Sequence, residues 1–410
     1  MFSQSTLLLI ILSCTVPGTA QIKLNRIPEP PKPPIISKGL NTESPIHTSS
    51  PYKIISIVAG SGIESRDAGS NGTGDGVGRN ARFYKPFDII SDGKGGFLIA
   101  DFLNYRIRQM TTDGTVTTFA GSSQGQEDGS LTEGRLYSPV SICLDKNGDL
   151  IVADKNWNAV RKITKTGIIT IAGGNGIGND NGDAKTATFN RPVSVAVNSK
   201  GDIFVCDEGN HVIRKISGNT VSTYAGNGNG GYADGAAAAA DFLYPKAITV
   251  DVNDNVYVAE GTMIRKITPA GMVSTLAGQE GVQGRRDGKG SKASFSALTE
   301  IIAGPSGILY VVDAGTTDAL SEDHSVNLRY RNGGAAIRLV SPDGSVQTVV
   351  GSYICTLPEN YFETHAAHKL NDGPVNKAFF NWDVFGICLD EDENIYVADA
   401  WLNCIRKVSK

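Results

Sequence analysis

The stretch "NIYVADAWLNCIRKVSK", residues 394–410, ends the chain and decides its fold. A similar stretch, "DIFVCDEGNHVIRKISGNTVSTYAG" at 202–226, continues through one more strand-like segment, "VSTYAG". The last copy therefore lacks its final strand. A segment of the missing type, "KIISIVAG" at 53–60, stands alone before the first copy. We predict that residues 54–59 pair with residues 404–408 and complete the last repeat.

From Tyr52 onward the sequence repeats six times. Each copy opens with an Asp-Gly or Asn-Gly dipeptide, whose first residues are Asp75, Asp128, Asn181, Asp234, Asp287 and Asp372. Eight positions later stand Phe83, Leu136, Phe189, Phe242, Phe295 and Phe380. The first five copies keep a step of 53 residues, and each holds four strand-like segments. A four-stranded unit recurring at about 50 residues is typical of a propeller blade.

Hydrophobic alternation within these segments is weak, which indicates strands that are buried on both faces. A linear stack of repeats needs polar end caps, and the sequence shows none. We therefore predict an all-β, six-bladed propeller of four-stranded blades over residues 52–410, closed by the strand 54–59. Closure leaves no open sheet edge where the two ends meet.

Two segments, "GNHVIRKI" at 209–216 and "NIYVAD" at 394–399, resemble the NHL-repeat family. The Asp-Gly, Phe-x-x-Pro, Val-Ala-Asp and Asn-x-x-Ile-Arg-Lys elements of that family occur here in the family order, and the resemblance covers residues 52–410. It implies a propeller that serves as an interaction platform. A few relatives are enzymes.

The first twenty residues, "MFSQSTLLLIILSCTVPGTA", are predicted to be a cleaved signal peptide, although no basic residue precedes the apolar run. Lipid attachment at Cys14 is the alternative, if the source is bacterial. Residues 21–51 contain "PEPPKPP" and a Ser/Thr/Pro-rich run, typical of a disordered tether. We expect a secreted protein with no membrane span.

Acidic and basic residues recur at fixed places after the second strand of a blade. In four copies an aspartate precedes an arginine by seven residues: Asp101 and Arg108, Asp154 and Arg161, Asp207 and Arg214, Asp399 and Arg406. An active site has no use for the same residue in every blade, whereas a scaffold does. We predict structural ion pairs, with each carboxylate and guanidinium meeting side by side.

The first strand of each blade lines the central channel of a propeller. Aligning the copies at the Phe positions places Asp88, Ser141, Ser194, Ala247, Glu300 and Gly386 at matching points of these strands. The scaffold repeats around them while they vary. Asp88, Ser141, Ser194 and Glu300 are therefore candidate ligand-binding residues at the channel mouth, and solvated bystanders are the alternative.

The sequence contains few groups of residues that could bind a metal ion. Glu363, His365 and His368 in "ETHAAH" supply half of a zinc site. Turns such as "DKNGD" at 145–149 resemble calcium loops, but they lack the glutamate that an EF-hand places at position twelve. We expect no cofactor and leave calcium or zinc open.

Two segments depart from the repeat. Residues 316–333 lie within an insertion between Asp313 and Arg338, and residues 352–370 form a long connection that is rich in aromatic residues. Loops on a rigid scaffold often carry function. We predict that both belong to blade five and form one contact patch beside the channel.

Two covalent features are predicted. Cys355 and Cys404 form the most plausible disulfide, and Asn71 begins the sequon Asn-Gly-Thr. We expect a glycan at Asn71 if the source is eukaryotic.

The net charge of −4 argues against a nucleic-acid partner, as does the leader. The leading hypothesis is therefore a monomeric, non-catalytic scaffold that binds an extracellular protein or glycan. The alternative is a metal-dependent hydrolase or lyase with its site at the channel mouth.

Overall fold

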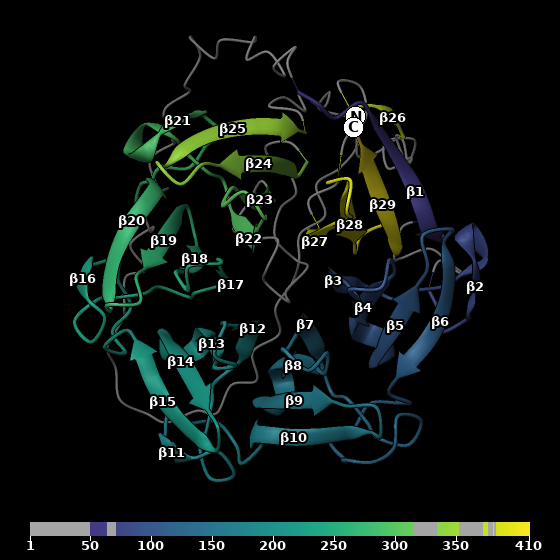
Figure 1. Cartoon of the computed structure of the whole chain (residues 1–410), viewed down its shortest axis with the longest axis horizontal. Helices are drawn as coiled ribbons and strands as arrows, with labels where there is room; N and C mark the ends of the chain where they lie inside the picture. Colours follow the sequence, from purple (N-terminus) through teal and green to yellow (C-terminus); the bar gives the residue numbers. More distant parts are fainter. Residues whose placement is uncertain (1–49, 64–70, 315–333, 352–371, 376–379, 381–382) are drawn as a thin grey trace, which may run out of the picture. The chain divides into compact units, whose positions relative to one another are not determined.

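The computed structural model describes residues 50–63, 71–314, 334–351, 372–375, 380 and 383–410. The chain divides into two compact units, Met1–Thr42 and Glu43–Lys410, and all described residues belong to the second. Among them the structure has strands and short 3-10 turns but no α-helix. The strands form six sheets around a central axis (Figure 1). The predicted all-β, six-bladed propeller is confirmed.

Each blade is an antiparallel sheet whose inner strand lies at the channel. Blade one contains β3 (Pro86–Ser91), β4 (Phe97–Asp101), β5 (Arg106–Met110), β6 (Thr115–Ala120) and β2 (Gly76–Val77). Blade two contains β7 (Pro139–Leu144), β8 (Leu150–Asp154), β9 (Ala159–Ile163) and β10 (Ile168–Gly173). Blade three contains β12 (Pro192–Val197), β13 (Ile203–Asp207), β14 (Val212–Ser217), β15 (Thr220–Ala225) and β11 (Gly182–Asp183).

The other half of the ring follows the same plan. Blade four contains β17 (Ala247–Val250), β18 (Val256–Glu260), β19 (Met263–Ile267), β20 (Met272–Gly278) and β16 (Gly235–Ala236). Blade five contains β22 (Leu298–Ala303), β23 (Leu309–Asp313), β24 (Ala336–Val340), β25 (Ser345–Val350) and β21 (Gly288–Lys289). Blade six contains β27 (Val384–Leu389), β28 (Ile395–Asp399), β29 (Cys404–Ser409), β1 (Ile54–Gly60) and β26 (Gly373–Pro374).

Five of the six sheets have five strands, not the four that the sequence predicted. The extra outer strand is only two residues long and begins at the glycine of the Asp-Gly or Asn-Gly dipeptide, as in the pairing of Gly76 with Val116. Blade two makes a single bridge there, between Gly129 and Ile168. Two residues are too few for a hydrophobic period to register, so sequence patterning missed this strand.

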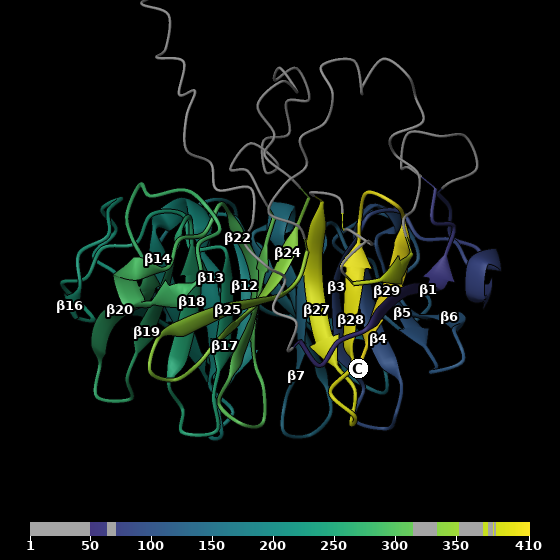
Figure 2. The ribbon, with the colours of Figure 1, turned by 90° about the horizontal axis from the view of Figure 1, so that it is seen from above.

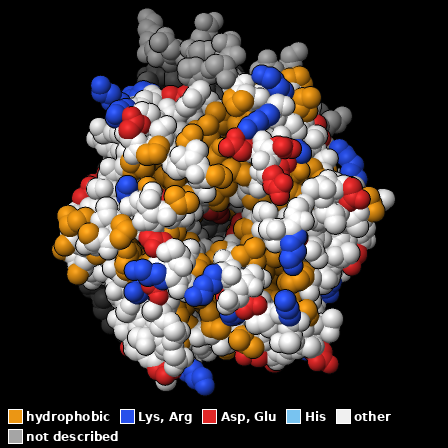
Figure 3. Space-filling model, viewed as in Figure 1, with side chains coloured by type: hydrophobic (Ala, Val, Ile, Leu, Met, Phe, Trp, Pro, Cys, Tyr) orange, Lys and Arg blue, Asp and Glu red, His pale blue; other side chains and the backbone are white. Residues whose placement is uncertain are grey.

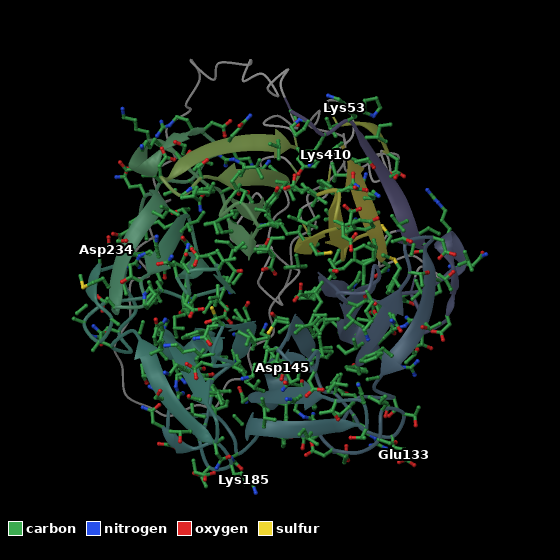
Figure 4. All side chains as sticks on the ribbon, viewed as in Figure 1. Lys53, Glu133, Asp145, Lys185, Asp234 and Lys410 are labelled. Carbon is green, nitrogen blue, oxygen red and sulfur yellow. The ribbon has the colours of Figure 1, made fainter. Side chains whose placement is uncertain are left out.

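The predicted ring closure is confirmed. Strand β1 pairs with β29 in antiparallel register, from Ile54 opposite Ser409 to Gly60 opposite Cys404. The Lys53 N–H also donates to the Ser409 carbonyl (2.7 Å), and Lys53 and Lys410 lie side by side (Figure 4). Blade six is therefore built from both ends of the described chain.

The contacts of the propeller begin earlier than predicted. Ser50, which was expected to lie in the tether, is buried and donates its hydroxyl to the Val349 carbonyl in blade five (3.1 Å). The signal peptide 1–20 and nearly all of the tether 21–51 lie outside the described residues and stay predictions.

The two faces of the ring differ. Every inner strand runs from the same face of the ring to the opposite one. Figure 2 shows this direction for β27. We call the face where the inner strands begin the entry face, and the face where they end the exit face. The links from one blade to the next, and the turns between second and third strands, lie on the entry face. Three of the turns between second and third strands carry 3-10 segments: η2 (Phe102–Asn104), η3 (Lys155–Trp157) and η4 (Glu208–Asn210).

The core fills the spaces between blades. The second strands are buried along their whole length in all six blades. The aromatic residues at the repeated Phe positions are fully buried, namely Phe83, Phe189, Phe242, Phe295 and Phe380. Each therefore packs between two sheets, which fixes the blades as a rigid frame for the channel.

Candidate functional site

The structure brings all four predicted aspartate–arginine pairs into contact. The distances between Nη1 and Oδ2 are 2.9 Å for Arg108 and Asp101, 3.2 Å for Arg161 and Asp154, 2.9 Å for Arg214 and Asp207, and 3.4 Å for Arg406 and Asp399. Blades four and five have the same contact, between Arg265 and Glu260 and between Arg338 and Asp313. All six arginine side chains are essentially inaccessible to solvent.

The pairing is not the side-by-side fork that the sequence suggested. In blade three, Arg214 Nη1 donates to Asp207, and Nη2 donates to Asn181 Oδ1 (2.9 Å). Asn181 belongs to the Asn-Gly dipeptide, and the matching residues in blades one and four, Asp75 and Asp234, hold their arginines likewise. One guanidinium thus joins the second strand of a blade to its outer edge. This arrangement supports a structural role.

Burial raises the pKa of these carboxyl groups, whereas the neighbouring arginines lower it. It raises the pKa of Asp101 to about 6, although Arg108 and Asn104 lower it. It raises the pKa of Asp399 to about 6 in the same way. Each of the six buried arginines therefore needs its carboxylate partner, because a buried charge without a partner destabilises the fold.

The four channel candidates lie within the channel wall. Asp88, Ser141 and Ser194 are buried, and each accepts a hydrogen bond from the backbone of the next blade. The donors are Ile142 N–H to Asp88 Oδ2 (2.7 Å), Val195 N–H to Ser141 Oγ (3.3 Å) and Ile248 N–H to Ser194 Oγ (3.1 Å). These side chains therefore also link neighbouring inner strands.

Gly386 occupies the matching position in blade six, where the inner strand β27 lies next to β3 of blade one. A Cβ on Gly386 would lie 2.5 Å from Asp88 Cα and 2.7 Å from Ile89 N. Only a residue without a side chain allows β27 to approach β3 this closely.

Two carboxyl groups of the channel wall have no basic partner among the described contacts. Burial raises the pKa of Asp88 to about 7, although hydrogen bonds from Ile142, Ile89 and Ser141 lower it. Burial, with the nearby Asp88, raises the pKa of Glu300 well above its ordinary value. Burial in the channel wall therefore favours the protonated form of Glu300.

A hollow of about 570 Å³ opens on the entry face at the channel. Each blade contributes one residue to its rim, from the inner strand or, for Lys246, immediately before it: Phe87, Val140, Val193, Lys246, Thr299 and Phe385. Ser141, Ser194 and Glu300 form its deeper part. They also line a second hollow, of about 600 Å³, that opens toward the other end of the inner strands. They are therefore not at the mouth, as predicted, but between the two hollows.

The rim of the entry hollow has an aromatic side and a charged side. Phe87 stacks on Phe385 of the neighbouring blade, with ring centroids 4.1 Å apart, and Phe102 packs on Phe87 at 4.6 Å. Blades two to four contribute Lys155, Arg191, Glu208 and Lys246 instead. Glu208 is nearly buried and pairs with Lys246 and with Arg191 Nε (3.3 Å).

Arg191 is held in an unusual backbone conformation. Its φ is 59°, and its N–H donates to Asn158 Oδ1 of the preceding blade (2.8 Å). Such left-handed residues are costly for side chains other than glycine and cluster at functional sites. Lys85 has the same conformation (φ 53°), with Asn403 as the acceptor. Lys85 does not line the hollow.

The exit hollow is mainly aliphatic. Ile90, Leu144, Val197, Val250 and Ile302 line it, with Asp88 among the polar residues in its wall. Figure 3 shows the propeller end-on, with a central opening surrounded by hydrophobic side chains.

Sequence reasoning missed the rim of the entry hollow. The rim residues immediately precede the aligned channel positions, and none of them was among the candidates. The signal was available, because aligned positions of a repeat that carry Phe, Val, Lys and Thr cannot all serve the scaffold alike.

The remaining predicted site residues are not part of the channel wall or are outside the described residues. Glu363, His365, His368 and Cys355 are outside the described residues, as are the segments 316–333 and 352–370. Cys404 is buried in β29, and the disulfide stays a prediction. Asn71 is half-buried, and the next residue, Gly72, accepts a hydrogen bond from Asn104 Nδ2 (2.6 Å).

Two absences concern the part of the chain that the structure describes. No three histidine, cysteine or carboxylate side chains in that part of the chain gather as metal ligands. No helix in it is long and apolar enough to cross a bilayer.

The sequence matches two family models. The model described as NHL repeat matches residues 189–216, and the one described as teneurin NHL domain matches residues 225–289. Mouse teneurin-4 is 26% identical over 232 residues, which cover 50% of this chain and 8% of teneurin-4. The protein SUPPRESSOR OF QUENCHING 1, chloroplastic, of Arabidopsis thaliana is 32% identical over 94 residues, 22% of this chain and 9% of that protein. The chain thus spans less than a tenth of these relatives.

Solved structures share the fold at low identity. A Bacteroides thetaiotaomicron protein of unknown function has a TM-score of 0.60 at 18% identity, over 87% of this chain and 76% of that one. An auxiliary nutrient binding protein from Bacteroides ovatus has a TM-score of 0.59 at 14% identity, with the same coverage.

Proposed function

Because the chain belongs to the NHL-repeat family and folds as a six-bladed propeller, we propose that it is a secreted, non-catalytic scaffold that binds an extracellular protein or glycan. The contact patch comprises residues 316–333 and 352–370 of blade five. The ring supplies rigidity, and the variable loops supply specificity.

The observation that carries this proposal is where the two segments attach. Residues 316–333 connect Asp313 at the end of β23 to Ala336 at the start of β24, and these two residues face each other in the sheet. In blade one the corresponding residues, Asp101 and Arg106, are joined by a short turn on the entry face. Residues 352–370 follow Gly351, which leaves blade five on that same face. Both departures from the repeat therefore start on the entry face.

The experiment is a binding screen of the full chain against arrays of extracellular proteins and glycans. Each hit is then titrated against three proteins: the wild type, a deletion of residues 316–333, and Val252→Ser. Val252 is 80% exposed in a turn between first and second strands, and so lies on the exit face. We expect the deletion to abolish binding and Val252→Ser to leave it unchanged. A folded deletion protein that binds as tightly as wild type contradicts the proposal.

The alternative, a metal-dependent hydrolase or lyase, is tested separately by metal analysis of the purified chain. Stoichiometric zinc or calcium that is lost on changing His365 and His368 to alanine would support it. We expect no stoichiometric metal.

A further inference from the structure

The channel wall repeats one hydrogen bond from blade to blade, and among its polar residues Glu300 is the exception. Asp88, Ser141 and Ser194 each accept a backbone N–H of the next blade. Asp88 also accepts the N–H of its own following residue (2.7 Å), so both of its carboxyl oxygens are used. Within the described part of the chain, Glu300 accepts one hydrogen bond, from Ile301 N–H to Oε1 (2.9 Å). Its Oε2 therefore has no role in holding the blades together.

Asp88 and Glu300 act on the same part of the channel. They belong to blades one and five, and the matching residue of blade six between them is Gly386. Since Gly386 has no side chain, blade six places none between the two carboxyl groups at this level. The two groups are close enough that Asp88 contributes to the raised pKa of Glu300.

The exit hollow, of about 600 Å³, brings apolar surface up to these two groups. The aliphatic residues in its wall are Ile90, Leu144, Val197, Val250 and Ile302. Each of the five is only half-buried, whereas the second strands behind them are buried throughout. Covering such surface with an apolar group is favourable. An apolar wall with a few convergent polar groups is also the usual form of a small-molecule site.

The lining of the exit hollow favours a positively charged ligand over a negatively charged one. None of the described residues that line it is basic. Its ionisable side chains are Asp88, Glu300 and Cys143, and none of these can carry a positive charge in any protonation state. The formal charge of the lining is therefore negative or zero, whichever form the two carboxyl groups take.

A bound cation also acts on the protonation of the wall. Burial and the nearby Asp88 raise the pKa of Glu300. A positive charge close to a carboxyl group favours its ionised form and lowers that pKa again. An ammonium group can therefore bind with release of the Glu300 proton to solvent, which leaves an ammonium–carboxylate pair and no net change of charge in the hollow.

We propose that the exit hollow binds a small organic cation, an alkylammonium whose charged end lies against Glu300 and Asp88 and whose alkyl body lies along the aliphatic wall. This proposal does not rest on the scaffold function proposed above. The hollow opens toward the exit face, whereas the blade-five segments attach on the entry face. Either proposal can therefore fail without the other.

The test is isothermal titration of the full chain at about pH 8, where an alkylamine remains protonated. Four probes separate charge from apolar body: hexylammonium, the neutral 1-hexanol, methylammonium, and the anion hexanoate. We expect hexylammonium to bind at least about tenfold more tightly than each of the others, because a charge-assisted contact and alkyl burial both contribute. Absence of hexylammonium binding overturns the proposal, as does binding of 1-hexanol or hexanoate that is equally tight.

A matched pair of variants locates the charged end. Glu300→Gln removes the charge but keeps an acceptor for Ile301 N–H. Glu391→Gln makes the same change at an exposed residue in the turn after β27, on the exit face but outside the hollow. We expect Glu300→Gln, but not Glu391→Gln, to weaken hexylammonium binding by about tenfold and to leave 1-hexanol binding unchanged. Unchanged hexylammonium binding to folded Glu300→Gln contradicts the proposal.

A third variant locates the alkyl body. Val197→Thr keeps the shape of the wall but replaces a methyl group by a hydroxyl, so it should weaken hexylammonium and 1-hexanol alike. A urea unfolding curve, measured beside each titration, establishes that the variants are folded. If Val197→Thr is folded and binds both probes as the wild type does, the body does not lie in the exit hollow and the proposal fails.

The ammonium group can belong to a free amine or to the side chain of a lysine in a peptide. Nα-acetyl-lysine methylamide, added as a competitor of hexylammonium, distinguishes the two sources. Displacement supports a lysine side chain as the ligand, and hexylammonium binding that the competitor does not displace supports a free amine.

Discussion

Replacing Arg214 by methionine tests whether the six buried arginines, one in each blade, stabilise the propeller. The guanidinium is inaccessible to solvent, donates to Asp207 Oδ2 and to the Thr188 carbonyl (3.0 Å), and lies 5.1 Å from the centre of the Phe189 ring. Methionine fills much of the volume but donates nothing. Losing one charge-assisted hydrogen bond costs about 1.5–3 kcal/mol, and leaving a buried carbonyl without a donor costs about 1–3 kcal/mol. The sum agrees with the roughly 3–5 kcal/mol expected when one partner of a buried pair is removed.

The pH dependence of this loss gives a second readout. Burial raises the pKa of Asp207, and Asn190 N–H, Asn210 and Arg214 oppose that rise. Removing Arg214 therefore raises the pKa of Asp207 further in the folded state. Because the folded variant then binds a proton that the unfolded chain releases, its stability increases as the pH falls through the folded-state pKa. The deficit should be smaller near pH 5 than near pH 8.

The assay is urea unfolding of wild type, Arg214→Met and the control Lys215→Met at both pH values. Lys215 is the next residue along β14, and its Nζ lies 3.7 Å from Asp202 in a partly exposed pair. Its removal should cost no more than about 1 kcal/mol. The reasoning is refuted if Arg214→Met loses no more stability than the control. It is also refuted if the deficit of Arg214→Met does not depend on pH.

Three further outcomes are expected. The wild type should become more stable as the pH falls from about 8 to about 5, because the pKa of Asp88 is raised to about 7; Asp88→Asn should reduce this gain in urea unfolding, and a wild-type stability that is flat over this range would count against it. Gly386→Ala should cost about 1–3 kcal/mol because β27 must move away from β3, whereas Gly74→Ala, whose Cβ would have its nearest neighbour at 3.8 Å, should be tolerated; equal midpoints for the two would disprove the close approach. Secretion from a eukaryotic host should add a glycan at Asn71, seen as a mass difference that Asn71→Gln removes, and unchanged mass would exclude the modification.

The closure of the ring could be predicted from the sequence because the last repeat lacks its fourth strand, and a segment of that type stands before the first repeat. The segment 53–60 has the same Ala-Gly ending as the fourth strands of blades one to four, and no other partner was left for it. The two-residue outer strands were not accessible, since pairing such as that of Gly182 with Val221 depends on where the dipeptide lands in three dimensions.

The candidate site was only partly accessible. Aligning the copies identified the channel wall correctly, but depth along the channel depends on the register of each inner strand against the second strand, such as Asp88 opposite Ala100. The cluster of Arg191, Glu208 and Lys246 joins residues from two interblade links and one turn. Their separations in sequence share no repeat spacing, so only the fold brings them together.

The most direct test of the account compares two truncated chains, one starting at Ser50 and one starting at Ser61. The first keeps β1, including the fully buried Ile55 and Ala59, and the second removes it and exposes the edge of β29. We predict that the chain starting at Ser50 unfolds in urea with the same midpoint as the full chain, and that the chain starting at Ser61 loses its cooperative transition or aggregates through the open edge. If both truncated chains unfold at the midpoint of the full chain, β1 does not close the ring.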